Sequence, residues 1–337
     1  MFLPSSFPCL GRSRFSLGRY SIVPLRYEDR FLIMRWRNAQ IYHLRQARPL
    51  TEEDQERYFG TAIAQMYQVK ERPEQLLFSY LRDGECIGYG GLVHINWLNR
   101  NAEVSFIMDT KLEADEFALH WTNWLTLLRA IAFGQLGLHK IYTYAFDLRP
   151  HLYPVLESAG FVKEAVLKEH CLFEGQYKDV VIHSLWPYTV KNYKECSKGE
   201  LLEVLELRNR PEIRSLMVNQ APIAVEDHFR FVEGLSGRKD RRYFAVYSHD
   251  GGLAGTYNLL DEGGGKWDRG IVSAQPGKGR TAWWEFQLLG MMGNEVNALT
   301  AIVKPDNLAS VRYHQKIGFR EVGRDPDYIH YILPLDE

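Results

Sequence analysis

A glycine-rich segment in the second half of the chain has the residue types and spacing to bind an anion. It runs from Gln275 to Thr281 (QPGKGRT), follows an apolar run that we expect to be a strand, and precedes a helix predicted from Ala282. Glycines let backbone N–H groups approach an anion closely, and a helix N-terminus adds partial positive charge. The segment is therefore a candidate pyrophosphate site, with a plain glycine turn as the alternative.

The elements that would position this loop occur twice along the chain. In each half an Arg-Asn pair ends a helical pattern, a Pro follows, an Asp-Gly turn lies between two β-rich runs, and Gly-Phe comes last. Such self-similarity indicates one fold used twice. The paired landmarks are Arg37-Asn38 and Arg208-Asn209, Pro49 and Pro222, Asp83-Gly84 and Asp250-Gly251, and Gly160-Phe161 and Gly318-Phe319.

Each half also follows the same order of predicted elements. One strand and two helical patterns precede a hairpin at Asp-Gly, which favours the turns that match strand twist. A further strand, a long helix and another strand follow. This order predicts an α/β domain in which helices cover a mixed sheet. Trp186-Pro187 and the polar segment after it mark the boundary, so we expect domains at residues 1–187, which include an N-terminal extension, and 188–337.

Composition excludes several classes of partner. The 337 residues include 41 Lys and Arg against 42 Asp and Glu, so no net field would attract nucleic acid or an anionic membrane. No apolar run approaches the ~20 residues that span a bilayer. The four cysteines have neither metal spacing nor the density of a secreted disulfide scaffold. We expect a cytoplasmic protein without a bound metal.

Downstream of the glycine loop, the segment TAIVKPDNLASVRYHQKIGFREVG resembles a signature of the GNAT acetyltransferase superfamily. That signature has an Asn after a strand, a small residue, a helix and then Gly-Phe. The loop itself resembles the superfamily's Arg/Gln-x-x-Gly-x-Gly/Ala signature, although two of its three defined positions depart, Pro276 and Thr281. The matching residues of the downstream segment are Asn307, Ala309, Ser310, Lys316, Gly318 and Phe319.

The resemblance implies a fold and a cofactor. The expected fold class is α/β (α+β), with two tandem GNAT-type domains, each a mixed, mostly antiparallel sheet flanked by helices. The implied reaction is direct transfer of acetyl from acetyl-CoA to an amine in a ternary complex. We expect the second domain to bind the cofactor through Gly270, Ile271, Val272, Gly277, Lys278, Gly279, Arg280, Thr281, Asn307 and Ser310.

Amine attack on a thioester needs groups that move protons. A base must take the amine proton, and the leaving thiolate needs a proton or a hydrogen bond. The superfamily often places a tyrosine four residues before the glycine of Gly-Phe; here that position is His314, with Tyr313 adjacent. Imidazole can donate a proton near neutral pH. A helix-surface histidine without a role is the alternative. For the base we consider Asp261, Glu262 and Asp268, each otherwise a solvated carboxylate.

The first half resembles the branch of the superfamily that contains ribosomal-protein N-terminal acetyltransferases and nucleotide-amino-sugar N-acetyltransferases, through Gly160, Phe161, Gly175, Tyr177 and Asp179. It departs where the cofactor would bind. Its loop segment DTKLEADEF lacks glycine and carries Glu113, Asp115 and Glu116, whose carboxylates would repel a pyrophosphate. Arg149 replaces the expected Asn, and Leu156 replaces the proton donor. We expect the first domain not to bind acetyl-CoA in the usual way.

The start of the second half suggests the acceptor. Arg208, Asn209, Met217, Asn219, Pro222, Ile223 and His228 match the pattern of nucleotide-amino-sugar N-acetyltransferases. This resemblance implies that Asn219 and His228 line the acceptor pocket; core packing of the same helices is the alternative. The expected acceptor is a small-molecule amine, first a nucleotide-linked amino sugar and second a protein N-terminus or another small amine. A catalytically silent tandem scaffold is the other hypothesis. A homodimer and an intramolecular pseudo-dimer both remain open.

Overall fold

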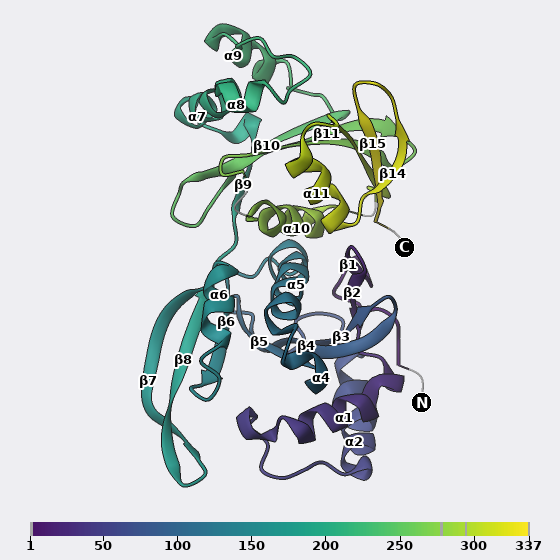
Figure 1. Ribbon diagram of the computed structural model, residues 1–337, viewed down its shortest axis with the longest axis vertical. Helices are drawn as coiled ribbons and strands as arrows, with labels where there is room; N and C mark the ends of the chain where they lie inside the picture. The colour runs from purple at the N-terminus through teal and green to yellow at the C-terminus, as the bar shows by residue number, and fades with distance from the viewer. Residues whose placement is uncertain (1–2, 277–278, 294, 336–337) are drawn as a thin grey trace. The chain divides into compact units, whose positions relative to one another are not determined.

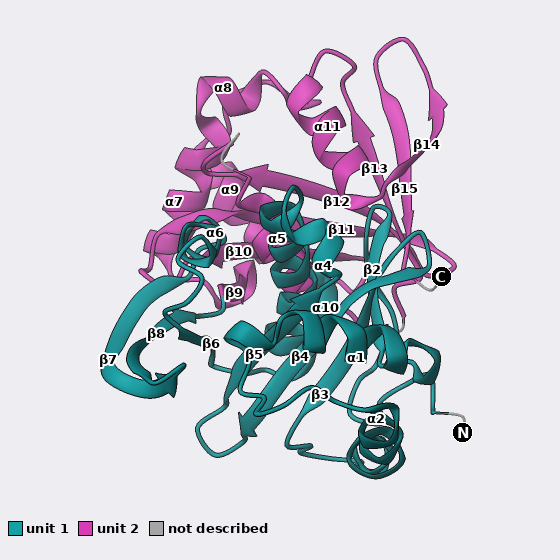
Figure 2. Cartoon of the chain, turned by 60° about the horizontal axis from the view of Figure 1, so that its bottom comes forward, with its two compact units in different colours: residues 1–187, 289–291 teal, residues 188–288, 292–337 magenta. Residues whose placement is uncertain are grey.

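The computed structural model describes residues 3–276, 279–293 and 295–335. The chain divides into two compact units (Figure 2): the first comprises Met1–Pro187 with Leu289–Met291, and the second comprises Tyr188–Leu288 with Met292–Glu337. In the described part of the chain, no helix is both long enough and apolar enough to cross a membrane.

The first unit is built on an eight-stranded sheet in the order β1-β2-β3-β4-β5-β6-β8-β7 (Figure 1). Neighbouring strands are antiparallel except β5 and β6, which are parallel. The strands are β1 (Phe15–Leu17), β2 (Tyr20–Pro24), β3 (Leu76–Arg82), β4 (Glu85–Asn96), β5 (Asn101–Met108), β6 (Lys140–Phe146), β7 (Val162–Phe173) and β8 (Gln176–Leu185).

Aromatic side chains hold the long helix of the first unit against this sheet. Trp124 is fully buried and stacks on Phe106 of β5 with ring centroids 4.6 Å apart. The N-terminal segment also belongs to this core, because Phe7 is 1% exposed and stacks on Tyr67 at 4.7 Å. The helices are α1 (Arg30–Ala39), α2 (Glu52–Tyr58), α3 (Ala64–Met66), α4 (Thr110–Glu113), α5 (Phe117–Arg129) and α6 (Leu152–Ser158).

The second unit is built on a seven-stranded sheet in the order β14-β15-β13-β12-β11-β10-β9. Here too one neighbouring pair, β12 and β13, is parallel and the others are antiparallel. The strands are β9 (Thr189–Asn192), β10 (Arg241–Tyr247), β11 (Leu253–Gly263), β12 (Lys266–Ser273), β13 (Ala298–Val303), β14 (Arg320–Arg324) and β15 (Ile329–Pro334).

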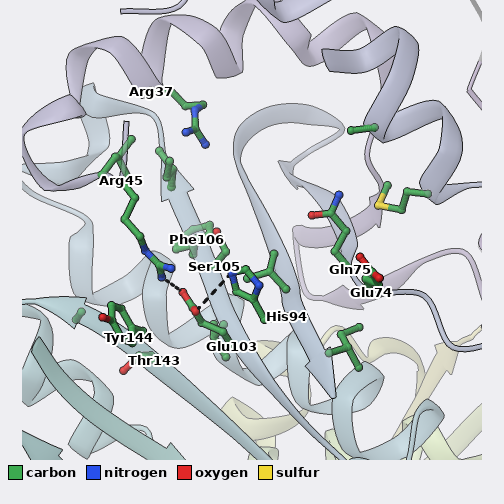
Figure 3. Close-up of a pocket in the computed structure, with 18 of the residues that line it drawn as sticks. Arg37, Arg45, Glu74, Gln75, His94, Glu103, Ser105, Phe106, Thr143 and Tyr144 are labelled. Carbon is green, nitrogen blue, oxygen red and sulfur yellow. Dashed lines mark hydrogen bonds and ion pairs between the residues drawn. The ribbon is translucent and has the colours of Figure 1, made fainter. Parts of the chain in front are cut away.

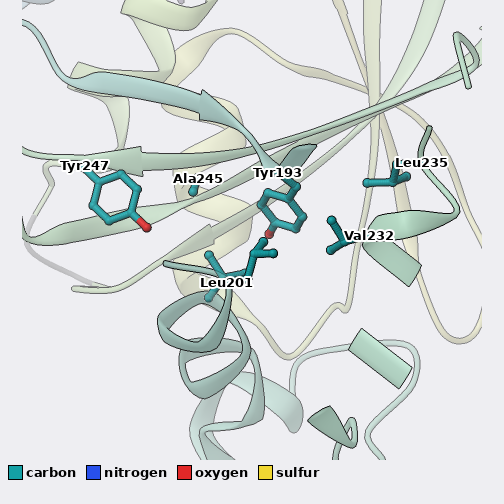
Figure 4. Packing of buried hydrophobic residues seen from close by; sticks show 7 residues of the cluster. Tyr193, Leu201, Val232, Leu235, Ala245 and Tyr247 are labelled. Atoms are coloured by element: carbon teal, nitrogen blue, oxygen red, sulfur yellow. The ribbon is translucent and has the colours of Figure 1, made fainter. Parts of the chain in front are cut away.

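Helices cover both faces of the second sheet. On one face, a cluster that includes Tyr193, Leu201, Val232 and Ala245 joins the helices α7 and α9 to β10 (Figure 4). On the other face, Trp284 of α10 is 1% exposed and contacts the ring of Tyr257 edge-on at 6.3 Å. The helices are α7 (Lys198–Asn209), α8 (Pro211–Arg214), α9 (Val225–Glu233), α10 (Thr281–Met291) and α11 (Leu308–Ile317).

The two units share one topology. When the second sheet is read from β9 to β14, its order matches that of the first sheet from β2 to β7, and both place the single parallel pair at the same step. Asp83-Gly84 turns β3 into β4 with φ of +52° and +87°, as the Asp-Gly signal predicts. The predicted fold class, two tandem mixed and mostly antiparallel sheets flanked by helices, is confirmed.

The repeated Arg-Asn and Pro landmarks have a structural cause. The side chain of Asn38 bonds both backbone groups of Leu50, with the Leu50 N–H at 2.7 Å and its carbonyl at 2.9 Å. Asn209 bonds Ile223 in the same way, at 2.9 Å for both groups. In each unit, the asparagine thus ties the end of one helix to the segment that leads into the next.

Candidate functional site

Each sheet opens at its parallel pair. Strands β5 and β6 pair over three positions, which end at Glu103 and Tyr142, and beyond these residues the two strands separate. Strands β12 and β13 also pair over three positions, which end at Asp268 and Thr300. Past that point each central strand bonds a neighbour on one side alone, so alternate backbone N–H and C=O groups point into the opening. We call each opening a splay.

A carboxylate lies at the root of each splay, on the same face of its sheet. Glu103 pairs with Val93 of β4. It lies on the opposite face of the sheet from Phe106, whose ring packs against Trp124 of α5. Asp268 pairs with Leu260 of β11. It lies on the opposite face of the sheet from Tyr257, whose ring packs against Trp284 of α10. Alternation along a strand places neighbouring side chains on opposite faces. Both carboxylates therefore lie on the face away from the long helix.

The splay of the first unit contains a cavity of about 1200 Å³ (Figure 3). Residues of both sheet faces line it, since Glu103 and Ser105 lie on one face and Phe106 on the other. Trp121 of α5 and Arg37 of α1 also line it, from helices on opposite faces. A cavity that passes through the sheet in this way lets two ligands meet from opposite sides. Its volume exceeds that of common small-molecule pockets.

Glu103 is the buried acidic group of this cavity. It is 7% exposed, forms an ion pair with Arg45, and lies 3.9 Å from the Nε2 atom of His94. Figure 3 shows the three side chains joined at the centre of the view. Burial raises the pKa of Glu103 above its ordinary value, although Arg45 and His94 act in the opposite direction.

The cofactor side of the first unit lacks the groups that hold a pyrophosphate. Residues 110–113 form the short helix α4 in place of a glycine loop. Glu113 pairs with Arg149 at 3.0 Å, and Glu116 pairs with Arg82 at 3.0 Å. The two arginines thus neutralise carboxylates of the chain itself. With carboxylates at the start of α5 and their arginines engaged, these residues do not fit the pyrophosphate.

The second unit keeps an open backbone where the glycine loop meets its helix. Gly279 has φ of +68°, and a Cβ atom built there would have no neighbour within 4 Å, so the backbone is accessible to a ligand. Arg280 is exposed, and Thr281 begins α10. The N-terminus of this helix and the accessible glycine fit a pyrophosphate. Gly277 and Lys278 lie outside the described residues.

The other predicted cofactor residues surround the same splay. Gly270, Ile271 and Val272 continue β12 beyond its last pair with β13. Asn307 caps α11, where its side-chain oxygen accepts the N–H of Ser310 at 3.1 Å. Among the described residues the amide nitrogen of Asn307 has no partner, so it can donate to a ligand.

The three candidate bases of the second unit differ in their surroundings. Asp261 is exposed and accepts the N–H of Gly263, which makes it a turn residue. Glu262 is exposed and accepts the hydroxyl of Thr300 at 2.9 Å. Asp268 is half-buried, and burial, followed by the charge of Glu262, raises the pKa of its carboxyl. Asp268 is therefore the best base of the three.

His314 lies in the core of the second unit and not on the helix surface. It is 2% exposed, and its Nδ1–H donates to the Ser310 carbonyl at 2.7 Å while Nε2 accepts from Arg269 at 3.1 Å. Burial, followed by the charge of Arg269, lowers the pKa of His314 to about 3. The imidazole is neutral with both nitrogens engaged. Its one N–H is engaged by the Ser310 carbonyl, so the placement favours a structural role, and the acid role of His314 stays a prediction.

Tyr313 belongs to the same network, so its hydroxyl is already engaged, and its acid role stays a prediction. Its hydroxyl donates to Glu285 of α10, and burial raises its pKa well above the ordinary value. Glu285 is fully buried and pairs with Arg269 at 2.8 Å. The network links β12, α10 and α11 through four polar side chains. Its role in the structure is to fix these elements together.

The two predicted acceptor residues differ in their surroundings. His228 is 6% exposed within the helical layer, its ring lies near those of Tyr193 and Phe229, and its buried Nε2 atom has no hydrogen-bond partner among the described residues. The core position favours packing, and the pocket role of His228 stays a prediction. Asn219 is exposed in the segment after α8, where its side chain accepts the N–H of Ala221 at 3.0 Å.

The sequence analysis did not predict some residues at the splays, although each has a weak signal in the sequence. Asn258 of β11 lies against Gly270, where a Cβ atom would approach its side-chain oxygen to 2.2 Å. Its signal is a single amide within the apolar run AGTYNLL. Glu103 has a comparable signal, a carboxylate within the strand AEVSFIM. Arg269 has a weaker one, because a charged residue in a strand usually faces solvent.

Comparisons with known proteins match parts of the chain to acetyltransferases. The family model described as the acetyltransferase (GNAT) domain matches residues 22–182. Acetyltransferase PseH of Campylobacter jejuni is 26% identical over 147 residues, which cover 43% of this chain and 92% of that protein. Spermidine N(1)-acetyltransferase of Vibrio cholerae is 34% identical over 96 residues, 28% of this chain and 53% of that protein.

Among solved structures, spermidine N-acetyltransferase from Vibrio cholerae in complex with CoA and spermine is similar to this chain. It is 22% identical, with a TM-score of 0.44, and the match covers 50% of this chain and 95% of that one.

Proposed function

We propose that the chain transfers an acetyl group to a primary amine by direct attack in a ternary complex, and that the reaction takes place in the second unit. The premise is that residues 22–182 match the GNAT acetyltransferase domain and that the chain is an acetyltransferase that uses acetyl-CoA. One observation carries the choice of unit. The second unit repeats the topology of the family-matched first unit and keeps an accessible glycine at the start of α10, where the first unit has paired carboxylates.

The residues of the second unit would hold the cofactor from three sides. The N-terminus of α10 with Gly279 would bind the pyrophosphate, the free edge of β12 at residues 270–272 would bond the pantetheine arm, and Asn307 would donate its amide. When bound, acetyl-CoA supplies an activated acetyl group as a thioester. Backbone N–H groups on the free edge of β12 would stabilise negative charge on the carbonyl oxygen.

Asp268 is the proposed base. As the amine nitrogen forms its bond to the carbonyl carbon and the bond to sulfur breaks, Asp268 takes the proton that the amine releases. Its raised pKa makes the carboxylate a stronger proton acceptor than an exposed aspartate. Because Tyr313 and His314 are both engaged in hydrogen bonds within the chain, we propose that the thiolate takes its proton from water.

For the acceptor, we propose a nucleotide-linked amino sugar, on the resemblance carried by residues 208–228. The alternative is a small polyamine or a protein N-terminus, and the named spermidine acetyltransferase among the relatives favours the polyamine. The acetylation of an acceptor panel by the full chain, with nucleotide amino sugars, spermidine and basic N-terminal peptides, separates these classes. Activity confined to the peptides would contradict the small-molecule proposal.

A matched pair of variants tests the choice of unit. Asp268→Asn removes the proposed base, so kcat/KM should fall roughly 10²- to 10⁴-fold. Glu103→Gln makes the equivalent change in the first unit and should leave kcat/KM within about twofold, since a group outside the reacting centre contributes little. Loss of activity in Glu103→Gln with retention in Asp268→Asn would move the reaction to the first unit.

A further inference from the structure

The cavity of the first unit has no assigned role if transfer takes place in the second unit. The cavity has a volume of about 1200 Å³, which is enough for a ligand. On its cofactor side Arg149 and Arg82 are paired with carboxylates, so it has no site for a pyrophosphate. The charges along the cavity wall indicate which ligand it would take. Four arginines, two histidines and two glutamates line it, namely Arg37, Arg45, Arg72, Arg149, His43, His94, Glu74 and Glu103.

In the described part of the chain, Arg37 and Arg72 are the cavity arginines that no carboxylate neutralises, and of these two Arg37 is half-buried whereas Arg72 is exposed. Its NH1 donates to the hydroxyl of Tyr89 at 2.6 Å and its Nε donates to Gln46 at 3.0 Å. Both partners are uncharged. No carboxylate among the described residues lies within ion-pair distance of Arg37, whereas Arg45 and Arg149 each have one. Figure 3 shows Arg37 apart from the Arg45–Glu103–His94 group.

The surroundings of Arg37 keep its charge uncompensated. The side chain is half-buried, and Tyr58 nearby stays neutral because burial raises its pKa to about 12. Removing a charge from water without a counter-charge is unfavourable. An anion in the cavity would provide the missing counter-charge. Guanidinium binds phosphate and carboxylate groups in a planar, two-point geometry.

The repeat supplies a second instance of the same arrangement. Arg208 takes the place of Arg37 before the clamping asparagine of the second unit, and it too has no carboxylate partner among the described residues. One buried nitrogen of Arg208, NH1, has no hydrogen-bond partner, and NH2 donates to the Asn219 carbonyl at 2.8 Å. The Arg-Asn pair thus combines a structural clamp with an uncompensated cation in both units.

We propose that the cavity of the first unit binds an anionic small molecule, one that carries a phosphate or a carboxylate group, through Arg37, without acetyl transfer. The aromatic lining residues Phe106, Trp121 and Tyr144 offer apolar contact area for the rest of the ligand. The proposed anion site does not involve the proposed base Asp268. A test of anion binding can therefore fail or succeed independently of the proposed acetyl transfer.

Titration calorimetry on the full chain without acetyl-CoA tests the proposal. The probes are uridine 5′-monophosphate, citrate and, as the neutral counterpart, uridine. The proposal expects at least one anion to bind more tightly than uridine, with an affinity that falls as salt rises. Binding of the nucleotide alone identifies a phosphate ligand, and binding of citrate as well identifies general anion recognition. Failure of both anions to bind, or equal binding of uridine, would overturn the proposal.

Variants on one helix locate the site. Arg37→Met should weaken anion binding roughly ten- to hundredfold, as expected for loss of a charged hydrogen bond. Arg35→Met removes an exposed arginine two residues away on α1 and should leave the affinity unchanged. Arg37→Lys keeps the charge, so partial binding should return even if Arg37→Met loosens α1. Arg208→Met should not alter this binding. Wild-type affinity in Arg37→Met would refute the assignment.

Discussion

Glu103 and Asp268 hold the same position in the two units, each as the last residue of its strand to pair with the parallel neighbour. Their surroundings differ. Glu103 is paired with Arg45, whereas Asp268 lies near a second carboxylate, Glu262. The neighbour of Glu103 is a cation and the neighbour of Asp268 is an anion, so the two carboxyl groups differ in how readily they take up a proton. An arginine partner favours the ionised and fixed state, and a nearby carboxylate favours proton uptake.

The pH dependence of acetylation should report the pair of Asp268 and Glu262. A base works when ionised, so kcat/KM should rise with pH through the pKa of Asp268, which burial and Glu262 raise above the ordinary value near 3.9. Glu262→Gln removes the repelling charge and should shift the acidic limb of the profile to lower pH. An acidic limb that is unmoved in Glu262→Gln would show that another group controls it.

Cofactor binding should distinguish the two units. In thermal unfolding with acetyl-CoA at about 100 times its dissociation constant, wild-type protein should gain about 2.7 kcal/mol. Gly279→Glu adds bulk and negative charge at an accessible left-handed position and should abolish this gain. Ala114→Glu makes a similar change beside α4 of the first unit and should preserve it. If Ala114→Glu alone abolished the gain, the cofactor would bind in the first unit.

The buried pair of Arg269 and Glu285 should matter for stability more than for chemistry. Glu285→Gln leaves Arg269 uncompensated at 3% exposure, so the free energy of unfolding should fall by about 3–5 kcal/mol. The exposed pair Arg230 and Asp227 is the control, and Asp227→Asn should change stability by about 0.5 kcal/mol at most. Urea denaturation measures both. A small effect of Glu285→Gln would mean that water reaches the network.

His314 should make stability depend on pH. Its pKa is about 3 in the folded protein and near 6.5 when unfolded, so the unfolded chain binds the extra proton between these values. The contribution is therefore complete above pH 6.5 and is lost as the pH falls. Relative to His314→Gln, the wild type should lose about 2 kcal/mol between pH 7.5 and 5. Parallel curves for the two proteins would contradict a neutral buried imidazole.

Local signals accounted for the fold, because each landmark has a local or single-contact cause. Asp83-Gly84 forms a turn with both residues at positive φ, and Asn38 and Asn209 each clamp one backbone segment. These causes depend on a few neighbouring residues. A single sequence therefore predicted the repeat, the hairpins and the fold class.

The site was less accessible to sequence reasoning, because burial depends on which face of a helix meets the sheet. The position of His314 four residues before Gly318 suggested an acid, but its side chain points into the network with Arg269. His228 likewise is 6% exposed within the helical layer. The spacing of residues defines their helical face, and tertiary packing decides whether that face reaches a ligand or the core.

The short parallel pairing has a mechanical consequence. In each unit, the two parts of the sheet are joined along that boundary by three paired positions, which end at Glu103 in one unit and at Asp268 in the other. A sheet joined over so short a length can bend there at little cost, whereas a ligand that bonds both free edges would stiffen it. Hydrogen exchange along 104–108 and 269–273 would then read out occupancy of each splay without any chemical turnover.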